Sequence, residues 1–153
     1  MTTEELYDKL KLIQKMKCET QNLELKSAEQ GYPKRLYDSL SSFSNQDDGG
    51  IIVFGIDEKQ DYKEVGVYDA QDIQKKINEQ CLQMNPVVRP LITVVEKENK
   101  KFVSAEIPGI DLADRPCYYQ GRGRLKGSYT RIGDSDEPMT ESEIYSYEAY
   151  RRK

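Results

Sequence analysis

The sequence contains no histidine, and it has only three cysteines among its 153 residues. Without histidine the chain cannot form a Ser-His-Asp or Cys-His catalytic arrangement, a histidine metal site or a histidine proton shuttle. The three cysteines, Cys18, Cys81 and Cys117, are odd in number and far apart. They support neither a disulfide framework nor a CxxC zinc site, and they are typical of a reducing cytosol.

Long apolar runs are also missing. The longest, Ile51–Phe54, has the length of a strand and is far shorter than the ~18 residues of a membrane span. The acidic start, Met1–Glu5, lacks the basic and apolar regions of a signal peptide. We therefore expect a cytoplasmic protein with no membrane partner.

The length is that of one compact domain, which we expect to span residues 1–153, with an N-terminal helix in 1–18 and a core in 19–150. The net charge of −4 argues mildly against a general nucleic-acid binder, whose usual footprint is basic. A helical pattern still continues at the last residues. For that reason the chain is expected to be the N-terminal part of a longer protein.

Helix and strand signals alternate along the chain. Capping boxes at Thr2/Glu5 and Thr140/Glu143 predict a first and a last helix, Asp69 caps a middle helix, and Pro33 is placed in the first turn of another. The serines of that Pro33 helix are expected on its surface. The predicted strands are 22–26, 51–56, 91–95, 102–107, 118–119 and 127–132. The fold class that follows is α/β (α+β), a mixed β-sheet flanked by helices.

Acidic side chains occur where two of the predicted strands begin and end. Glu19 and Glu24 surround the start of one strand, with Lys26 two residues beyond, and Asp57-Glu58 follows the end of another. Carboxylates that converge at one sheet edge can bind Mg²⁺ or Mn²⁺, which polarises a phosphodiester. The alternative is that these residues are ordinary solvated surface, as expected for most members of a set of 27 acidic residues.

A basic segment occupies residues 115–133, which contain no acidic residue and in which tyrosines alternate with the cations. Arginines contact phosphates and tyrosines offer stacking faces, the combination that single-stranded nucleic acid requires. The alternative is a solvated loop whose charges pair with the acidic residues that follow it, from Asp134 to Glu143. The candidate nucleic-acid-binding residues are Arg115, Arg122, Arg124, Lys126, Tyr129 and Arg131.

Several short motifs in this order resemble the Schlafen AlbA-like domain, also described as a divergent AAA or DNA-binding domain. They are Glu19–Lys26, Ser42–Asn45, Gly49–Asp57, Asn85-Pro86 and Tyr129–Ser135. The resemblance implies an α/β nucleic-acid-binding domain of the kind found in bacterial transcriptional regulators, with DNA the favoured partner.

The resemblance also implies a second function. Related domains of vertebrate Schlafens are metal-dependent ribonucleases that act on tRNA and rRNA through three carboxylates. By motif these fall on Glu19, Glu24 and Glu58 as catalytic and metal-binding residues, with Mg²⁺ or Mn²⁺ as the cofactor. Lys26 would stabilise the scissile phosphate or orient Glu24. Glu58 stands where those nucleases have aspartate, and Asp57 immediately precedes it.

Three hypotheses follow, in this order. The first is a non-catalytic DNA-binding module, the second a metal-dependent endoribonuclease, and the third an interaction domain that uses some of its 11 tyrosines as an interface. A homodimer with two-fold symmetry would join two basic patches into one groove.

Overall fold

The computed structural model describes residues 1–151. Its elements in chain order are α1 (Thr3–Met16), β1 (Leu23–Lys26), α2 (Tyr37–Ser44), β2 (Gly50–Phe54), β3 (Ile56–Asp57), the 3-10 turn η1 (Glu58–Gln60), β4 (Lys63–Glu64), α3 (Ala70–Leu82), β5 (Met84–Asn85), β6 (Leu91–Lys97), β7 (Lys100–Ile107), the 3-10 turn η2 (Leu112–Asp114), β8 (Tyr118–Tyr119), α4 (Gly123–Gly127), β9 (Tyr129–Ile132), β10 (Ser135–Pro138) and α5 (Glu141–Arg151).

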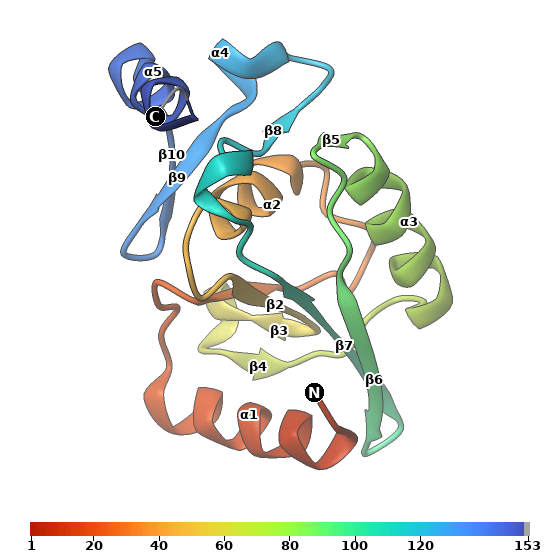
Figure 1. The fold of residues 1–153 in the computed structure, drawn as a ribbon. Helices are drawn as coiled ribbons and strands as arrows, with labels where there is room; N and C mark the ends of the chain where they lie inside the picture. The colour runs from red at the N-terminus through yellow and green to blue at the C-terminus, as the bar shows by residue number, and fades with distance from the viewer. Residues whose placement is uncertain (152–153) are drawn as a thin grey trace.

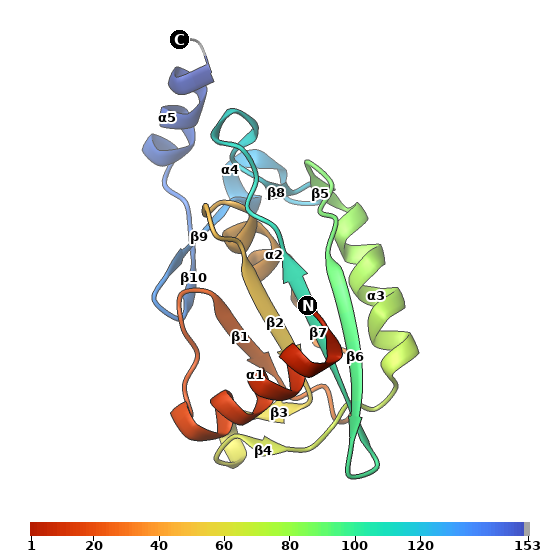
Figure 2. The ribbon, with the colours of Figure 1, turned by 60° about the horizontal axis from the view of Figure 1, so that its bottom comes forward.

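A four-stranded sheet in the order β1-β2-β7-β6 forms the centre of the molecule. β1 and β2 run parallel, joined through α2, whereas β2, β7 and β6 pair antiparallel. The predicted mixed sheet flanked by helices is therefore confirmed. Helix α1 covers one face of the sheet, and α2 and α3 cover the other (Figures 1 and 2).

Strand β2 is buried on both faces because it lies between these two helical layers. The side chain of Val53 packs with α1, while Ile52 and Phe54 pack with α2 and α3. Complete burial of such a side chain stabilises the fold by about 1.5–3 kcal/mol. The continuous apolar run in the sequence reflects this double burial.

Several elements differ from the sequence prediction. Helix α4 and strand β10 were not predicted, and β9 begins at Tyr129 rather than at residue 127. Helix α2 begins at Tyr37 rather than near Pro33, with Leu36 as its N-cap and no side-chain capping hydrogen bond. The predicted strand 51–56 is interrupted at Gly55, whose φ of +115° is a conformation that favours glycine.

The C-terminal third packs against α2 through the buried side chain of Asn45. Its Nδ2 donates to the carbonyl oxygens of Cys117 (3.1 Å) and Tyr129 (3.0 Å), and to Oγ of Ser41 (3.3 Å). Its Oδ1 accepts from the amide of Cys117 at 2.7 Å. One amide side chain thus fixes both β8 and β9 against the helix.

Replacement of this amide is expected to be costly. Asn45→Ala leaves buried backbone groups of Cys117 and Tyr129 without their partners, so the free energy of unfolding should fall by about 2–4 kcal/mol. Urea unfolding measures the change. Asn78→Ala, an exposed position on α3, is the matched control and should change stability by less than about 0.5 kcal/mol. Equal stability of the two variants would contradict the role of Asn45.

Candidate nucleic-acid interface

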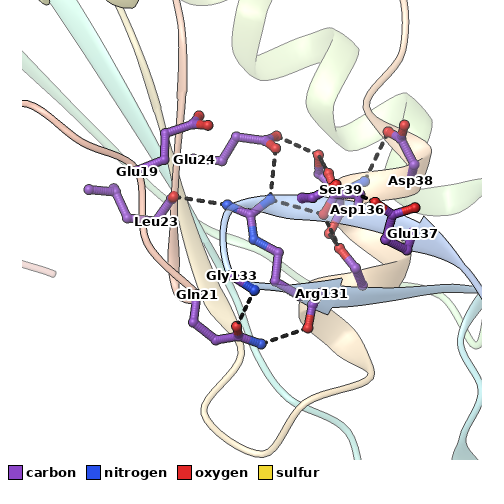
Figure 3. Close-up of polar contacts among 12 residues, drawn as sticks. Glu19, Gln21, Leu23, Glu24, Asp38, Ser39, Arg131, Gly133, Asp136 and Glu137 are labelled. Atoms are coloured by element: carbon purple, nitrogen blue, oxygen red, sulfur yellow. Dashed lines mark hydrogen bonds and ion pairs between the residues drawn. The ribbon is translucent and has the colours of Figure 1, made fainter.

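Arg131 of β9 lies in the centre of a buried polar network (Figure 3). Its side chain is fully buried, and Nη1 lies 3.0 Å from Oε1 of Glu24 and 3.0 Å from Oδ1 of Asp136. Nη2 donates to the carbonyl oxygens of Thr20 and Leu23, each at 3.0 Å. Strand β1 and the β9–β10 hairpin are therefore joined by one guanidinium.

Two serines of α2 complete the network. Oγ of Ser39 donates to Asp136 at 2.8 Å and also contacts Glu24, and Oγ of Ser42 donates to Asp136. The prediction that the serines of this helix face solvent is wrong. Ser39, Ser41, Ser42 and Ser44 are all buried, because the C-terminal third covers this face of the helix.

The two carboxylates of the network differ in how easily they ionise. Burial raises the pKa of Glu24, and the charge of Lys26 opposes that effect only in part. Burial acts in the same direction on Asp136, but hydrogen bonds from Ser42, Ser39 and Arg131 outweigh it and hold the pKa below its ordinary value. Asp136 is therefore the more acidic member of this coupled pair.

Glu19 lies beside this network, where its carboxylate accepts a hydrogen bond from the amide of Leu25 at 2.6 Å. Burial raises its pKa from 4.5 to about 7, and the negative charges of Glu58 and Glu24 contribute in the same direction. Glu24 and Glu58 are therefore near enough to Glu19 to raise the pKa of its carboxyl group.

The arrangement of these carboxylates does not fit a divalent cation. Both oxygens of Glu24 are already engaged, one by Arg131 and the other by Ser39, and Lys26 Nζ lies 3.8 Å from Glu24 Oε2. Glu58 is exposed in the turn η1. Within residues 1–151 no group of three acidic or cysteine side chains is placed to hold a metal ion.

Two of the predicted nucleic-acid-binding arginines are internal. Arg131 is enclosed by the network described above, and Arg115 is also buried. Arg115 Nε donates to the carbonyl of Ile110 at 2.9 Å, and its Nη2 pairs with Asp47 at 2.8 Å. Both guanidiniums therefore hold loops and strands together. Of their carboxylate partners only Asp136 belongs to the acidic residues that follow the segment, and neither arginine lies in a solvated loop.

The other basic residues of the segment are exposed on or beside α4. Arg124 pairs with Glu148 of α5 at 2.5 Å. Arg122 and Lys126 form no ion pair within the described residues, 1–151. Arg122 Nη1 instead donates to the hydroxyl of Tyr129 at 3.1 Å. Tyr129 itself is only 4% exposed, so its ring face is not available to a ligand.

Arg35 joins this surface from the loop before α2, a contribution that the sequence analysis missed. Its Nη2 donates to the same Tyr129 hydroxyl at 3.1 Å. Its guanidinium lies 5.1 Å from the ring centroid of Tyr37, which stacks on Tyr119 at 4.2 Å. The only signal in the sequence is the basic pair Lys34-Arg35 before a tyrosine. We call the exposed cations Arg35, Arg122, Arg124 and Lys126 the basic surface.

The chain is similar to a known protein family and to solved structures. A family model described as Schlafen, AlbA_2 matches residues 19–140. The solution NMR structure of the N-terminal domain of a Nitrosomonas europaea protein, described as related to the ATP-dependent DNA helicase RecG, is similar with a TM-score of 0.65 and 26% identity. The similarity covers 87% of this chain and 92% of that one.

A second solved structure, the DIP2311 protein of Corynebacterium diphtheriae, is similar with a TM-score of 0.59 and 17% identity. The match covers 97% of this chain but only 29% of that one, so the chain corresponds to a minor part of that protein. Comparison with curated proteins yields no match. No helix in the described part of the chain is both long and apolar enough to cross a membrane.

The raised pKa of Glu19 predicts a pH-dependent stability. The folded state retains this proton between pH 4.5 and about 7, whereas the unfolded chain releases it near pH 4.5. The stability associated with the protonated carboxyl is therefore complete below pH 4.5 and is lost as the pH rises through about 7. Glu19→Gln keeps an acceptor for the Leu25 amide but carries no charge.

Urea unfolding of both proteins across this range measures the effect. We expect equal stability near pH 4.5 and a more stable Glu19→Gln variant above pH 7. A constant difference between the two proteins at every pH would show that Glu19 titrates normally.

Proposed function

The chain belongs to the Schlafen AlbA_2 family, whose model matches residues 19–140, and from that premise we propose that it is a nucleic-acid-binding domain. The observation that carries the proposal is the basic surface on and around α4. Arg122 and Lys126 there have no carboxylate partner within residues 1–151. Exposed cations without partners attract phosphates, and they release condensed counterions when they bind them.

The internal ion pairs sharpen this proposal. Arg115 and Arg131 are themselves buried, and their guanidiniums are paired with Asp47 and with Glu24, so we assign neither of them to an outer binding face. Binding is assigned to the basic surface alone, with Tyr129 as the residue that positions Arg35 and Arg122 rather than as a stacking face.

DNA is the proposed partner. This chain is similar to the N-terminal domain of a protein described as related to a DNA helicase. The family resemblance in the sequence also favours DNA. A role within a transcriptional regulator, as the N-terminal part of a longer protein, belongs to the same proposal. Assembly into a homodimer, which would join two basic surfaces, stays a prediction.

Substitution of the basic surface tests the proposal. We expect the double variant Arg122→Glu, Arg124→Glu to bind labelled DNA roughly 100-fold more weakly at low salt, because two phosphate contacts become repulsive. The wild-type affinity should fall steeply as salt is added. Fluorescence anisotropy measures both effects.

The matched control carries the same change in charge on the opposite side of the sheet. Lys11→Glu, Lys15→Glu alters two exposed residues of α1 and should leave the affinity nearly unchanged. Equal losses in the two double variants would mean that net charge, and not the basic surface, governs binding.

The alternative function, a metal-dependent endoribonuclease, predicts a different result. Because Arg131 and Ser39 occupy the oxygens of Glu24, we expect labelled tRNA and single-stranded DNA to stay intact both with Mn²⁺ and with EDTA. A denaturing gel detects any cleavage. Cleavage that disappears both with EDTA and in Glu58→Gln, a change at an exposed position, would instead establish the nuclease.

A further inference from the structure

Arg35 and Arg122 come from distant parts of the chain and converge on one oxygen. Nη2 of Arg35 and Nη1 of Arg122 each lie 3.1 Å from the hydroxyl of Tyr129. Two like charges are thus held close together around a single neutral acceptor. Because both guanidiniums donate to the same oxygen, their like charges repel each other, and an anion bound beside them would relieve that repulsion.

Little of the hydrogen-bonding capacity of this pair is used by the protein. A guanidinium carries five N–H donors. Arg122 forms no ion pair within residues 1–151, and the carboxylate nearest to Arg35 is that of Asp38, at the long distance of 4.0 Å from Nε. Arginine forks match the oxygens of a phosphate in pairs. The remaining donors are therefore suited to a phosphate group.

An aromatic stack lies beside the two arginines. Tyr37 and Tyr119 are half-buried and stack with their ring centroids 4.2 Å apart and their planes 13° from parallel. The guanidinium of Arg122 is 6.0 Å from the centroid of Tyr37, and that of Arg35 is 5.1 Å away. The half-buried rings of Tyr37 and Tyr119 therefore provide aromatic surface next to any phosphate held by this pair.

We propose that Arg35 and Arg122 together bind one phosphate of a single-stranded nucleic acid, with a neighbouring unpaired base packed against the Tyr37–Tyr119 stack. This inference rests on the proposed function and specifies its ligand. Bases within a duplex already stack on one another and cannot reach a protein ring without being unstacked. The combination of an arginine pair and an aromatic stack therefore selects single strands over duplex.

Single and double substitutions test the shared phosphate. We expect Arg35→Gln and Arg122→Gln each to weaken binding of a labelled single-stranded DNA about tenfold. The double variant should lose far less than the product of the two losses, because both side chains contact one group. In the double variant the magnitude of the slope of log affinity against log salt concentration should be about 0.7 smaller than in the wild type, the value for the loss of one phosphate contact on a single strand.

Arg89→Gln is the matched control, an exposed arginine away from this site, and should bind as the wild type does. Thermal melting followed by circular dichroism verifies that every variant is folded. With a duplex of identical sequence, the wild type should bind more weakly than it binds the single strand. Arg35→Gln and Arg122→Gln should each reduce duplex binding by less than they reduce single-strand binding.

The outcomes separate this inference from the proposed function. If the wild type binds no nucleic acid, both fail. If it binds but Arg35→Gln and Arg122→Gln behave like Arg89→Gln, the phosphate site is wrong and the proposed function stands. Fully multiplicative losses would overturn the shared phosphate, and equally tight duplex binding would overturn the selection of single strands.

Discussion

The buried guanidinium of Arg131 is the interaction on which the arrangement of the C-terminal third depends. It contacts Glu24 on β1 and Asp136 on β10, and it also donates to two carbonyl groups before and within β1. A buried charge of this kind is costly unless it is paired, and removal of one partner costs about 3–5 kcal/mol. Its Nε has no hydrogen-bond partner among the described residues. The positive charge of Arg131 is therefore paired, although one of its N–H donors is not. Separation of the β9–β10 hairpin from the sheet would therefore break the ion pair between Arg131 and Glu24 and leave both charges without a partner.

This network also decides which kind of chemistry the acidic residues support. A carboxylate whose two oxygens are already in contact with an arginine and a serine is poorly placed to ligate a metal ion. Glu24 is in this position, whereas Glu19 is neutralised in part by its raised pKa and Glu58 faces solvent. Arg131 thus supplies, as a fixed part of the protein, the positive charge that a bound cation would bring. For this physical reason we propose a binding domain rather than a nuclease.

The distribution of charge explains how an acidic chain can bind nucleic acid. The chain carries a net charge of −4, but Coulomb interactions at a surface are screened within about 8–10 Å in physiological salt. A phosphate near α4 therefore responds to Arg122, Lys126 and Arg35 more than to the distant acidic residues. Glu148 moderates the field locally through its pair with Arg124.

The sequence by itself determined the helices with capping boxes, the apolar strand β2 and the mixed sheet, because capping and hydrophobic periodicity are local signals that tertiary contacts here reinforce. It also located the basic segment and the family. Only the tertiary structure decided which cations face solvent: Arg131 and Arg122 look alike in the sequence, yet one meets Glu24 and the other does not. Arg35 reaches Tyr129 across 94 positions of the chain. Pairings at such separation depend on how the sheet and α2 bring segments together, and no local pattern encodes them.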